Sequence, residues 1–361
     1  MSKDPRDLVR PEVLALKAYH VAPSQGRVKL DAMENPHRLP EALAREMGER
    51  LAAVAVNRYP DTAAPALRRR LREAMGIGPD LEVVLGNGSD ELIQMISLAL
   101  ARPGAVALAP EPSFVMYRMS AIVAGLRYEG VPLAPDFSLD EGALLQAIAR
   151  HRPALTWIAY PNNPSGNLFP REAILRVVEA SPGLVVVDEA YYPFSGGATL
   201  MDEAGRHPNL VVMRTVSKLG LAGLRIGIAA GPAAWMHEVE KLRPPYNVNS
   251  LSAAAGELLL ERREILDQQA RAIVAERSRL EGALDALPGA RRFSSAANFV
   301  LVRVPDAPRA FGALEARGIL VRNLHGSHPL LAHCLRLTVG TADENAKLIE
   351  ALASALAPHH A

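Results

Sequence analysis

Short apolar segments that alternate with helical segments are the feature of this sequence that most restricts its fold. The apolar segments include EVVLG, AVALAPEP, LTWIAYPNNP, GLVVVDEAY, NLVVMRTVSK and RIGIAAG, and helical patterns such as SDELIQMISLALA and PREAILRVVEA stand between them. Short strands rich in Val, Ile and Ala and separated by helices are typical of a mostly parallel sheet. The sequence therefore predicts an α/β domain in which helices cover both faces of such a sheet.

The segments before and after this pattern predict two further parts. Residues 1–36 are rich in turn formers, which indicates an extended N-terminal arm, and the large domain is expected over residues 37–250. Residues 251–361 open with a helical stretch, Ser252 to about Leu287, followed by the strand-like segments ANFVLVRV, GILVRNL and CLRLTVG and a closing helix, ADENAKLIEALASALA. This order predicts a smaller α+β domain, joined to the large one by the arm.

Composition excludes several classes of function. The 361 residues carry a net charge of +1 with no basic stripe, which argues against a nucleic-acid partner. No apolar run is long enough to span a membrane, and the charged first residues do not resemble a signal peptide. The single cysteine allows no internal disulfide, so a cytoplasmic protein is expected. The ten histidines show no ligand spacing, and we expect no metal.

Polar clusters follow four of the predicted strands. They are Gly86–Asp90, Asn162–Gly166, Asp188–Tyr191 and Ser217–Lys218. Ligands of open α/β sheets bind outside the carboxyl ends of the strands. The four clusters are therefore expected to meet at one edge of the sheet and to form a ligand site there.

The stretch RTVSKLGLAGLRIG places Lys218 among residues that would suit a nucleophilic amine. Ser217 supplies a hydroxyl, and Arg225 supplies a guanidinium fork for an anion. A lysine whose pKa is lowered by burial or by nearby positive charge attacks carbonyl groups. A lone lysine is more often a surface residue, so the neighbours carry this interpretation.

Two more clusters have both a functional and a structural interpretation. Gly88, Ser89 and Asp90 lie at the expected start of a helix, where backbone N–H groups bind phosphate, although the same residues are ordinary for a strand–turn–helix junction. Asp188 ends a buried strand, where it would either form a structural ion pair or face the ring nitrogen of pyridoxal phosphate. Tyr191 would then reach the phenolic oxygen of that ring.

Three residues complete the candidate set, each with a structural alternative. Asn163 is either a turn former or an amide donor to the same phenolic oxygen. Phe114 is either a core residue or a stacking partner for a flat ring, and Tyr59 stands in a turn before a proline. Together these residues supply what pyridoxal 5'-phosphate requires: an amine, a phosphate cradle, an acid for the ring nitrogen, donors and an aromatic side chain.

The clusters GNGSD, PNNPSG, DEAY and SKLGLAGLRIG, in this order, resemble the fold-type I pyridoxal-phosphate-dependent aminotransferases, and most closely the histidinol-phosphate aminotransferases. The resemblance extends from about Leu30 to Leu352. The arm segment LDAMENP resembles the pattern L-x-x-N-E-N-P of that group, with Met33 in place of its first asparagine. Phe114 stands where tyrosine is common, so a ring is kept and a hydroxyl is lost.

The resemblance implies a role for each candidate residue. Lys218 would hold the cofactor and move a proton, Asp188 would bind the ring nitrogen, and Tyr191 and Asn163 the phenolic oxygen. Phe114 would stack on the ring. The phosphate would be bound by Gly88, Ser89, Asp90, Ser217 and Arg225, with Tyr59 reaching it from the partner subunit of a homodimer. The residues implied for the substrate are Arg336, Arg322, Tyr19 and Asn35.

The same resemblance implies a reaction. It is the transfer of an amino group between L-histidinol phosphate and 2-oxoglutarate, which gives imidazole-acetol phosphate and L-glutamate in histidine biosynthesis. Two alternatives share these motifs: an aromatic amino-acid aminotransferase, and a threonine-phosphate decarboxylase of the cobalamin pathway. A regulator built on the same fold would normally carry a DNA-binding domain, and this chain has neither the length nor the basic patch for one.

Overall fold

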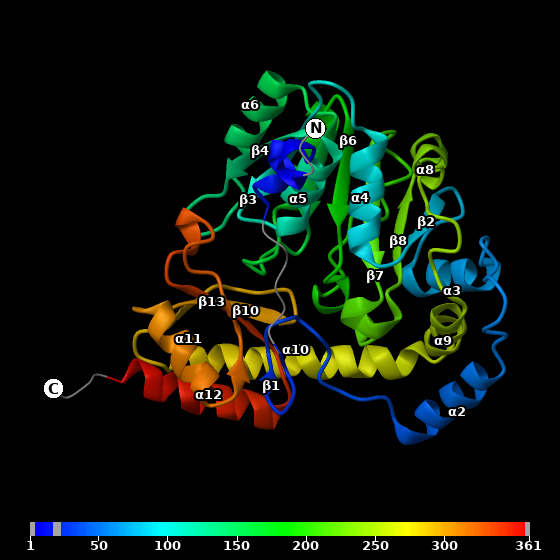
Figure 1. The fold of residues 1–361 in the computed structure, drawn as a ribbon. Coiled ribbons are helices and arrows are strands. Elements are labelled where there is room, and N and C mark those ends of the chain that lie inside the picture. Colours follow the sequence, from blue (N-terminus) through cyan, green and yellow to red (C-terminus); the bar gives the residue numbers. More distant parts are fainter. Residues whose placement is uncertain (1–3, 17–22, 358–361) are drawn as a thin grey trace.

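A seven-stranded sheet forms the centre of the large domain in the computed structural model, which describes residues 4–16 and 23–357 (Figure 1). The strand order is β2 (Glu82–Gly86), β8 (Gly227–Gly231), β7 (Leu210–Thr215), β6 (Leu184–Asp188), β5 (Leu155–Ala159), β3 (Val106–Glu111) and β4 (Arg127–Pro132). The pairs β7–β6, β6–β5, β5–β3 and β3–β4 are parallel, whereas β8 is antiparallel to both β7 and β2. The predicted mostly parallel sheet is confirmed.

Helices cover both faces of this sheet because successive strand residues point to opposite sides. Val186 packs with residues of α4 (Ser89–Ala99), α5 (Val115–Ala124) and α8 (Ala233–Glu240) on one face. Val185 and Val187 pack in the core that includes residues of α3 (Pro65–Met75), α6 (Glu141–His151) and α7 (Arg171–Ala180) on the other. Every residue of β5, β6 and β7 is consequently buried.

A second, smaller sheet forms the core of the small domain. Its order is β12 (Arg322–Asn323), β13 (Cys334–Thr338), β10 (Phe299–Arg303) and β9 (Arg291–Arg292), and all pairs are antiparallel. Apolar side chains of this sheet pack in one core with residues of α10 (Arg263–Asp285), α11 (Ala307–Ala316) and α12 (Ala342–Leu356). Figure 1 shows this layer below the large sheet, with α10 running beneath it. The predicted α+β domain is confirmed.

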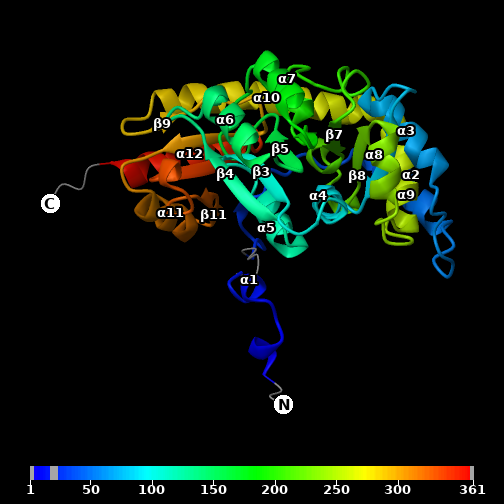
Figure 2. The ribbon, with the colours of Figure 1, turned by 90° about the horizontal axis from the view of Figure 1, so that it is seen from above.

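The N-terminal arm contributes a strand to the small domain. Its β1 (Val28–Lys29) pairs in parallel with β11 (Ile319–Leu320), after the short helices η1 (Pro5–Asp7) and α1 (Pro11–Leu14). Seen from above, η1 projects beyond the body of the molecule, and α1 lies next to α5 (Figure 2). The helical stretch that begins near residue 250 consists of two helices, α9 (Ser250–Glu261) and α10, which meet at Arg262.

Helix α9 packs on α3 and on α2 (Glu41–Ala52), so the passage to the small domain runs along α10. The exact domain limits at residues 36 and 250 stay predictions. Within residues 4–16 and 23–357, no helix is long and apolar enough to cross a membrane. The same residues contain no group of three or more His, Cys, Asp or Glu side chains placed to hold a metal ion.

Candidate active site

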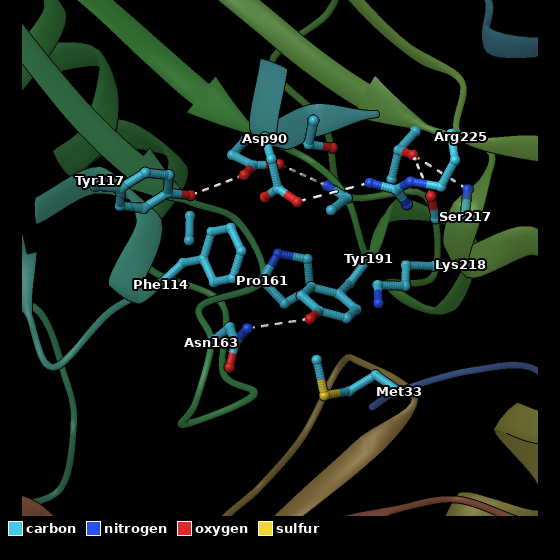
Figure 3. Close-up of a pocket in the computed structure, with 15 residues that line it drawn as sticks. Met33, Asp90, Phe114, Tyr117, Pro161, Asn163, Tyr191, Ser217, Lys218 and Arg225 are labelled. Atoms are coloured by element: carbon cyan, nitrogen blue, oxygen red, sulfur yellow. Dashed lines mark hydrogen bonds and ion pairs between the residues drawn. The ribbon is translucent and has the colours of Figure 1, made fainter. Parts of the chain in front are cut away.

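A cavity lies at the carboxyl edge of the large sheet, where the polar clusters of the sequence meet (Figure 3). Nine of the predicted side chains line it: Ser89, Asp90, Phe114, Asn163, Asp188, Tyr191, Ser217, Lys218 and Arg225. They come from the end of β6, the start of α4 and the segments that follow β3, β5, β6 and β7. The parallel order of the strands thus brings together residues that are more than a hundred positions apart in the chain.

Lys218 lies on the short helix η3 (Ser217–Leu219), directly after β7. Its amine donates a hydrogen bond of 3.2 Å to the carbonyl oxygen of Ala32 and lies 5.8 Å from the centre of the Tyr191 ring. Burial, and then the positive charge of Arg336, lower the pKa of this lysine to about 8. About a tenth of the amine is therefore uncharged at pH 7, and about half near pH 8, and the uncharged form is the one that acts as a nucleophile or a proton acceptor.

Asp188 ends β6 and is fully enclosed by the large domain. Burial raises the pKa of its carboxyl group to about 6, although two hydrogen bonds oppose this shift. The Tyr117 hydroxyl donates to Oδ2 at 2.8 Å, and the Ala190 backbone N–H donates to Oδ1 at 3.1 Å. Sequence analysis did not identify Tyr117, which lies three residues after Phe114 and therefore about one helical turn further along α5.

The start of α4 forms a cradle for an anion. The backbone N–H groups of a helix N-terminus point outward here, beside the Arg225 guanidinium and the Ser217 hydroxyl. Gly88 has a φ of +88°, and a Cβ at this position would lie 2.4 Å from Nη2 of Arg225. The positive φ favours glycine here, and a side chain at this position would also displace the end of the flexible Arg225 side chain. Arg225 Nη2 also lies 3.6 Å from the Asp90 carboxylate.

Arg336 connects the small domain to this cavity. It lies on β13, and its Nη1 donates a hydrogen bond of 2.6 Å to Oδ1 of Asn163, whose Nδ2 donates at 3.1 Å to the Tyr191 hydroxyl. Its Nη2 donates at 3.1 Å to the carbonyl oxygen of Asp31 in the arm. Arg322 on β12 is paired directly with Arg336 in the antiparallel register.

A larger cleft opens outside the first cavity. The inner cavity has a volume of about 110 Å³, and the outer cleft has about 830 Å³. Arg322 and Arg336 line the outer cleft, together with the large-domain residues Glu111 and Arg118. Among the described residues, Met33, Phe114 and Asn163 line both spaces, and we call these three residues the throat.

Three predicted residues lie elsewhere or outside the described part of the chain. Asn35 is not among the described residues that line either space, and its Nδ2 donates to Oε1 of Gln269 at 2.9 Å. Tyr59 is 80% exposed and stacks on Tyr246, with ring centres 4.4 Å apart. Tyr19 lies outside the described residues.

The donor set of the inner cavity fits pyridoxal 5'-phosphate. The cavity offers an amine of lowered pKa, a buried carboxylate, a phenol paired with an amide, and an anion cradle that a side chain at position 88 would fill. Phe114 adds an aromatic face at the same cavity. These are the groups that a phosphorylated pyridine aldehyde needs for attachment, orientation and charge balance.

Comparisons with known proteins give a consistent result. Residues 26–352 match the family model described as aminotransferase class I and II. The chain is 54% identical to the histidinol-phosphate aminotransferase of Chromobacterium violaceum over 96% of this chain and 97% of that protein. It is 54% identical to histidinol-phosphate aminotransferase 1 of Burkholderia lata over 98% and 99% of the two chains.

Among solved structures, the fold is similar to the histidinol-phosphate aminotransferase of Sinorhizobium meliloti in complex with pyridoxal-5'-phosphate. The TM-score is 0.86, the sequence identity is 24%, and the match covers 96% of this chain and 97% of that one. At this identity the likeness concerns the fold.

Proposed function

Because the chain belongs to the class I and II aminotransferase family, we propose that it transfers an amino group between L-histidinol phosphate and 2-oxoglutarate, with pyridoxal 5'-phosphate as cofactor. The products are imidazole-acetol phosphate and L-glutamate, in histidine biosynthesis. Relatives named histidinol-phosphate aminotransferase at 54% identity over nearly the full length favour this substrate over the two alternatives. One observation carries the proposal: the Lys218 amine, with a pKa of about 8, faces the same cavity as Asp188 and Arg225.

We assign a role to each cofactor-binding residue, and the convergence of these residues on one cavity supports the assignment. Lys218 holds the cofactor through its amine, Asp188 receives the ring nitrogen, and Tyr191 with Asn163 binds the phenolic oxygen. Phe114 covers the ring. The phosphate group is assigned to the cradle formed by Gly88, Ser89, Asp90, Ser217 and Arg225.

The chemistry divides between the bound group and the chain. When bound, pyridoxal phosphate supplies an electron sink for the pair that remains after a substrate Cα–H bond breaks. Lys218 takes the Cα proton with its uncharged amine, whose pKa near 8 suits transfer in both directions at neutral pH. Asp188 is ionised above about pH 6, and its carboxylate would favour the protonated form of the cofactor's ring nitrogen.

Arg336 and Arg322 are assigned to the anionic end of each substrate. A guanidinium fork binds carboxylate and phosphate with similar geometry, so the same pair can serve glutamate and histidinol phosphate in turn. Their place in the outer cleft, beyond the throat, supports this assignment. Tyr19 completes the proposed substrate set, whereas Asn35, which lines neither space, is left out of it.

We further propose a cytoplasmic homodimer with shared sites. In the single chain the cradle is open, since the side chains of Arg225 and Asp90 are 45% and 50% exposed. Val56 and Tyr59 in turn present exposed apolar surface that a partner subunit would cover, and Tyr59 would reach the partner's phosphate group. The single, buried cysteine suits a reducing compartment.

The test is a half-reaction without acceptor. The purified, cofactor-loaded protein should lose its visible absorption band on addition of L-histidinol phosphate and release imidazole-acetol phosphate. Conversion of phenylalanine alone would support an aromatic aminotransferase, and release of carbon dioxide from threonine phosphate would support the decarboxylase. Lys218→Ala should lower turnover by several orders of magnitude. Lys241→Ala is the control, because Lys241 is exposed and pairs only with Glu238 among the interactions recorded for it.

A further inference from the structure

Met33 has an unusual backbone conformation at a position next to the reactive amine. Its φ is +53°, in the left-handed region that side chains rarely adopt. Two hydrogen bonds hold it there: its N–H donates to Oγ1 of Thr338 at 3.0 Å, and its carbonyl oxygen accepts from Nδ2 of Asn298 at 2.9 Å. Both partners are buried residues of the small domain.

This conformation points the methionine side chain into the site. The two preceding carbonyl groups, of Asp31 and Ala32, accept hydrogen bonds from Arg336 and Lys218. In Figure 3 the thioether end of Met33 points toward the Tyr191 hydroxyl, from the side opposite Asp90 and Arg225. The arm thus contacts both basic groups through its backbone, and the buried Met33 lines both the inner cavity and the outer cleft.

The choice of methionine has a cost in the backbone that asparagine would largely avoid. Asparagine tolerates a positive φ much better than an unbranched apolar residue does. A left-handed backbone at a non-glycine residue is strained. Methionine at this position is therefore best explained by what its side chain does in the throat.

We propose that Met33 is a specificity-determining residue, whose thioether and the Phe114 ring receive the flat ring of an aromatic or heteroaromatic amino donor. The inference rests on the proposed function. A donor with its anionic end at Arg336 in the outer cleft and its amine near Lys218 in the inner cavity has its Cα at the throat, so the ring, which is carried by the other branch of Cα, lies beside the throat residues. Two of the three throat side chains are apolar, and sulfur makes favourable contacts with ring edges.

The same geometry accounts for discrimination between L-histidinol phosphate and glutamate. The carboxyl arm of glutamate has no ring to place against Met33 and Phe114, and only its charge is recognised. An amide in place of the thioether would add a donor and an acceptor, which would attract water into the throat and weaken contact with a ring. Met33→Asn is therefore expected to weaken ring recognition while it relieves the backbone.

Two amine-free ligands isolate the contribution of the ring. Imidazolylpropyl phosphate keeps the ring and the anion of the donor, and propyl phosphate keeps the anion alone. Their dissociation constants are measured by calorimetry on the cofactor-loaded protein. The dissociation constant of propyl phosphate divided by that of imidazolylpropyl phosphate reports ring recognition. Met33→Asn is expected to lower this ratio about tenfold, the scale of a small change in an apolar pocket. Met33→Leu, which keeps an apolar wall, is expected to stay within about threefold of the wild-type ratio.

Several outcomes would overturn the inference. One is an unchanged ratio in Met33→Asn, and another is a loss in Met33→Leu as large as in Met33→Asn, which would indicate packing of the arm alone. Thermal unfolding of each variant checks that the fold is kept. Failure of the proposed function has a different signature: the wild-type protein would bind the ring ligand in preference to propyl phosphate but would not convert L-histidinol phosphate.

Discussion

Asp188 and Glu189 are adjacent acids with different tasks, because successive residues at a strand end face opposite sides of the sheet. Asp188 faces the inner cavity and α5, where Tyr117 donates to it. Glu189 faces the other side and forms a buried pair with Arg214 at 2.6 Å. Desolvation raises the pKa of both carboxyl groups, so each depends on specific partners to remain ionised.

Removal of the Tyr117 hydroxyl should make cofactor affinity more sensitive to pH. The hydrogen bond from Tyr117 lowers the pKa of Asp188 against the effect of burial, so Tyr117→Phe is expected to raise that pKa further above about 6. A smaller ionised fraction then remains at pH 6 to pair with a protonated ring nitrogen. We expect the dissociation constant of pyridoxal phosphate to rise about tenfold at pH 6, the low end for a hydrogen bond to a charged group, and less at pH 8.5.

Tyr128→Phe serves as the control for this measurement. Tyr128 also bonds a carboxylate, that of Glu111, but it is absent from the described residues that line the inner cavity. Its replacement should leave the pH dependence of cofactor affinity unchanged. An equal loss of affinity at pH 6 and pH 8.5 in Tyr117→Phe would show that Tyr117 acts only through packing, for example through its stack on Trp157.

At the level of elements, the ion pair between Arg214 and Glu189 joins β7 to β6 beneath the site. The guanidinium donates to Glu189, to Thr199 Oγ1 and to the Met75 carbonyl oxygen, and it lies 3.7 Å from the centre of the Tyr192 ring. These contacts satisfy both charges inside the protein, where an unpaired charge is strongly unfavourable. The pair therefore fixes the strand ends that carry Asp188 and Lys218.

Arg214→Met should lower the free energy of unfolding by about 3–5 kcal/mol, because it leaves the Glu189 carboxylate buried without its cation. The measurement is the shift of the urea midpoint. Arg176→Ala is the matched control: Arg176 pairs with Glu141 at the surface, where its side chain is 52% exposed, and an exposed pair contributes little to stability. Similar losses in the two variants would contradict the role assigned to the buried pair.

Elements whose pattern is local could be predicted from the sequence, and those that depend on distant pairing could not. The buried strands and the clusters after them were predicted, since each shows its own apolar run. The segment GILVRNL was predicted as one strand, but it splits into β11 and β12. Its first half pairs with β1 in the arm, almost three hundred residues away, and its second half pairs with β13.

The same limit applies to the site residues. Lys218, Asp188 and Arg225 stand in recognisable clusters, so their convergence followed from the parallel order of the strands. The carbonyl partners of Lys218 and Arg336 in the arm, and the left-handed backbone of Met33, depend on how the arm lies across the small domain. No local pattern reports that path. Tyr117 could have been found from its helical spacing to Phe114.

At the scale of the whole molecule, the site that a single chain forms is open at the phosphate cradle. Half of the Asp90 side chain and nearly half of the Arg225 side chain are exposed there. Tyr59 and Tyr246 form a stacked, exposed pair on the same chain, away from the lining of both spaces. A symmetric dimer places the same patch of each subunit against the other, which allows the tyrosine of one chain to complete the cradle of its partner.

Mixed dimers test this arrangement directly. Lys218→Ala and Tyr59→Ala homodimers should both be impaired, but a heterodimer of the two contains one complete site, made of Lys218 from one chain and Tyr59 from the other. Random exchange of subunits should therefore restore about a quarter of wild-type activity, since half of the dimers are mixed and each has one complete site of two. A mixture of Lys218→Ala with Asp188→Asn should restore nothing, because both residues belong to the site of their own chain. Activity of the first mixture equal to the mean of its homodimers would remove Tyr59 from the partner's site.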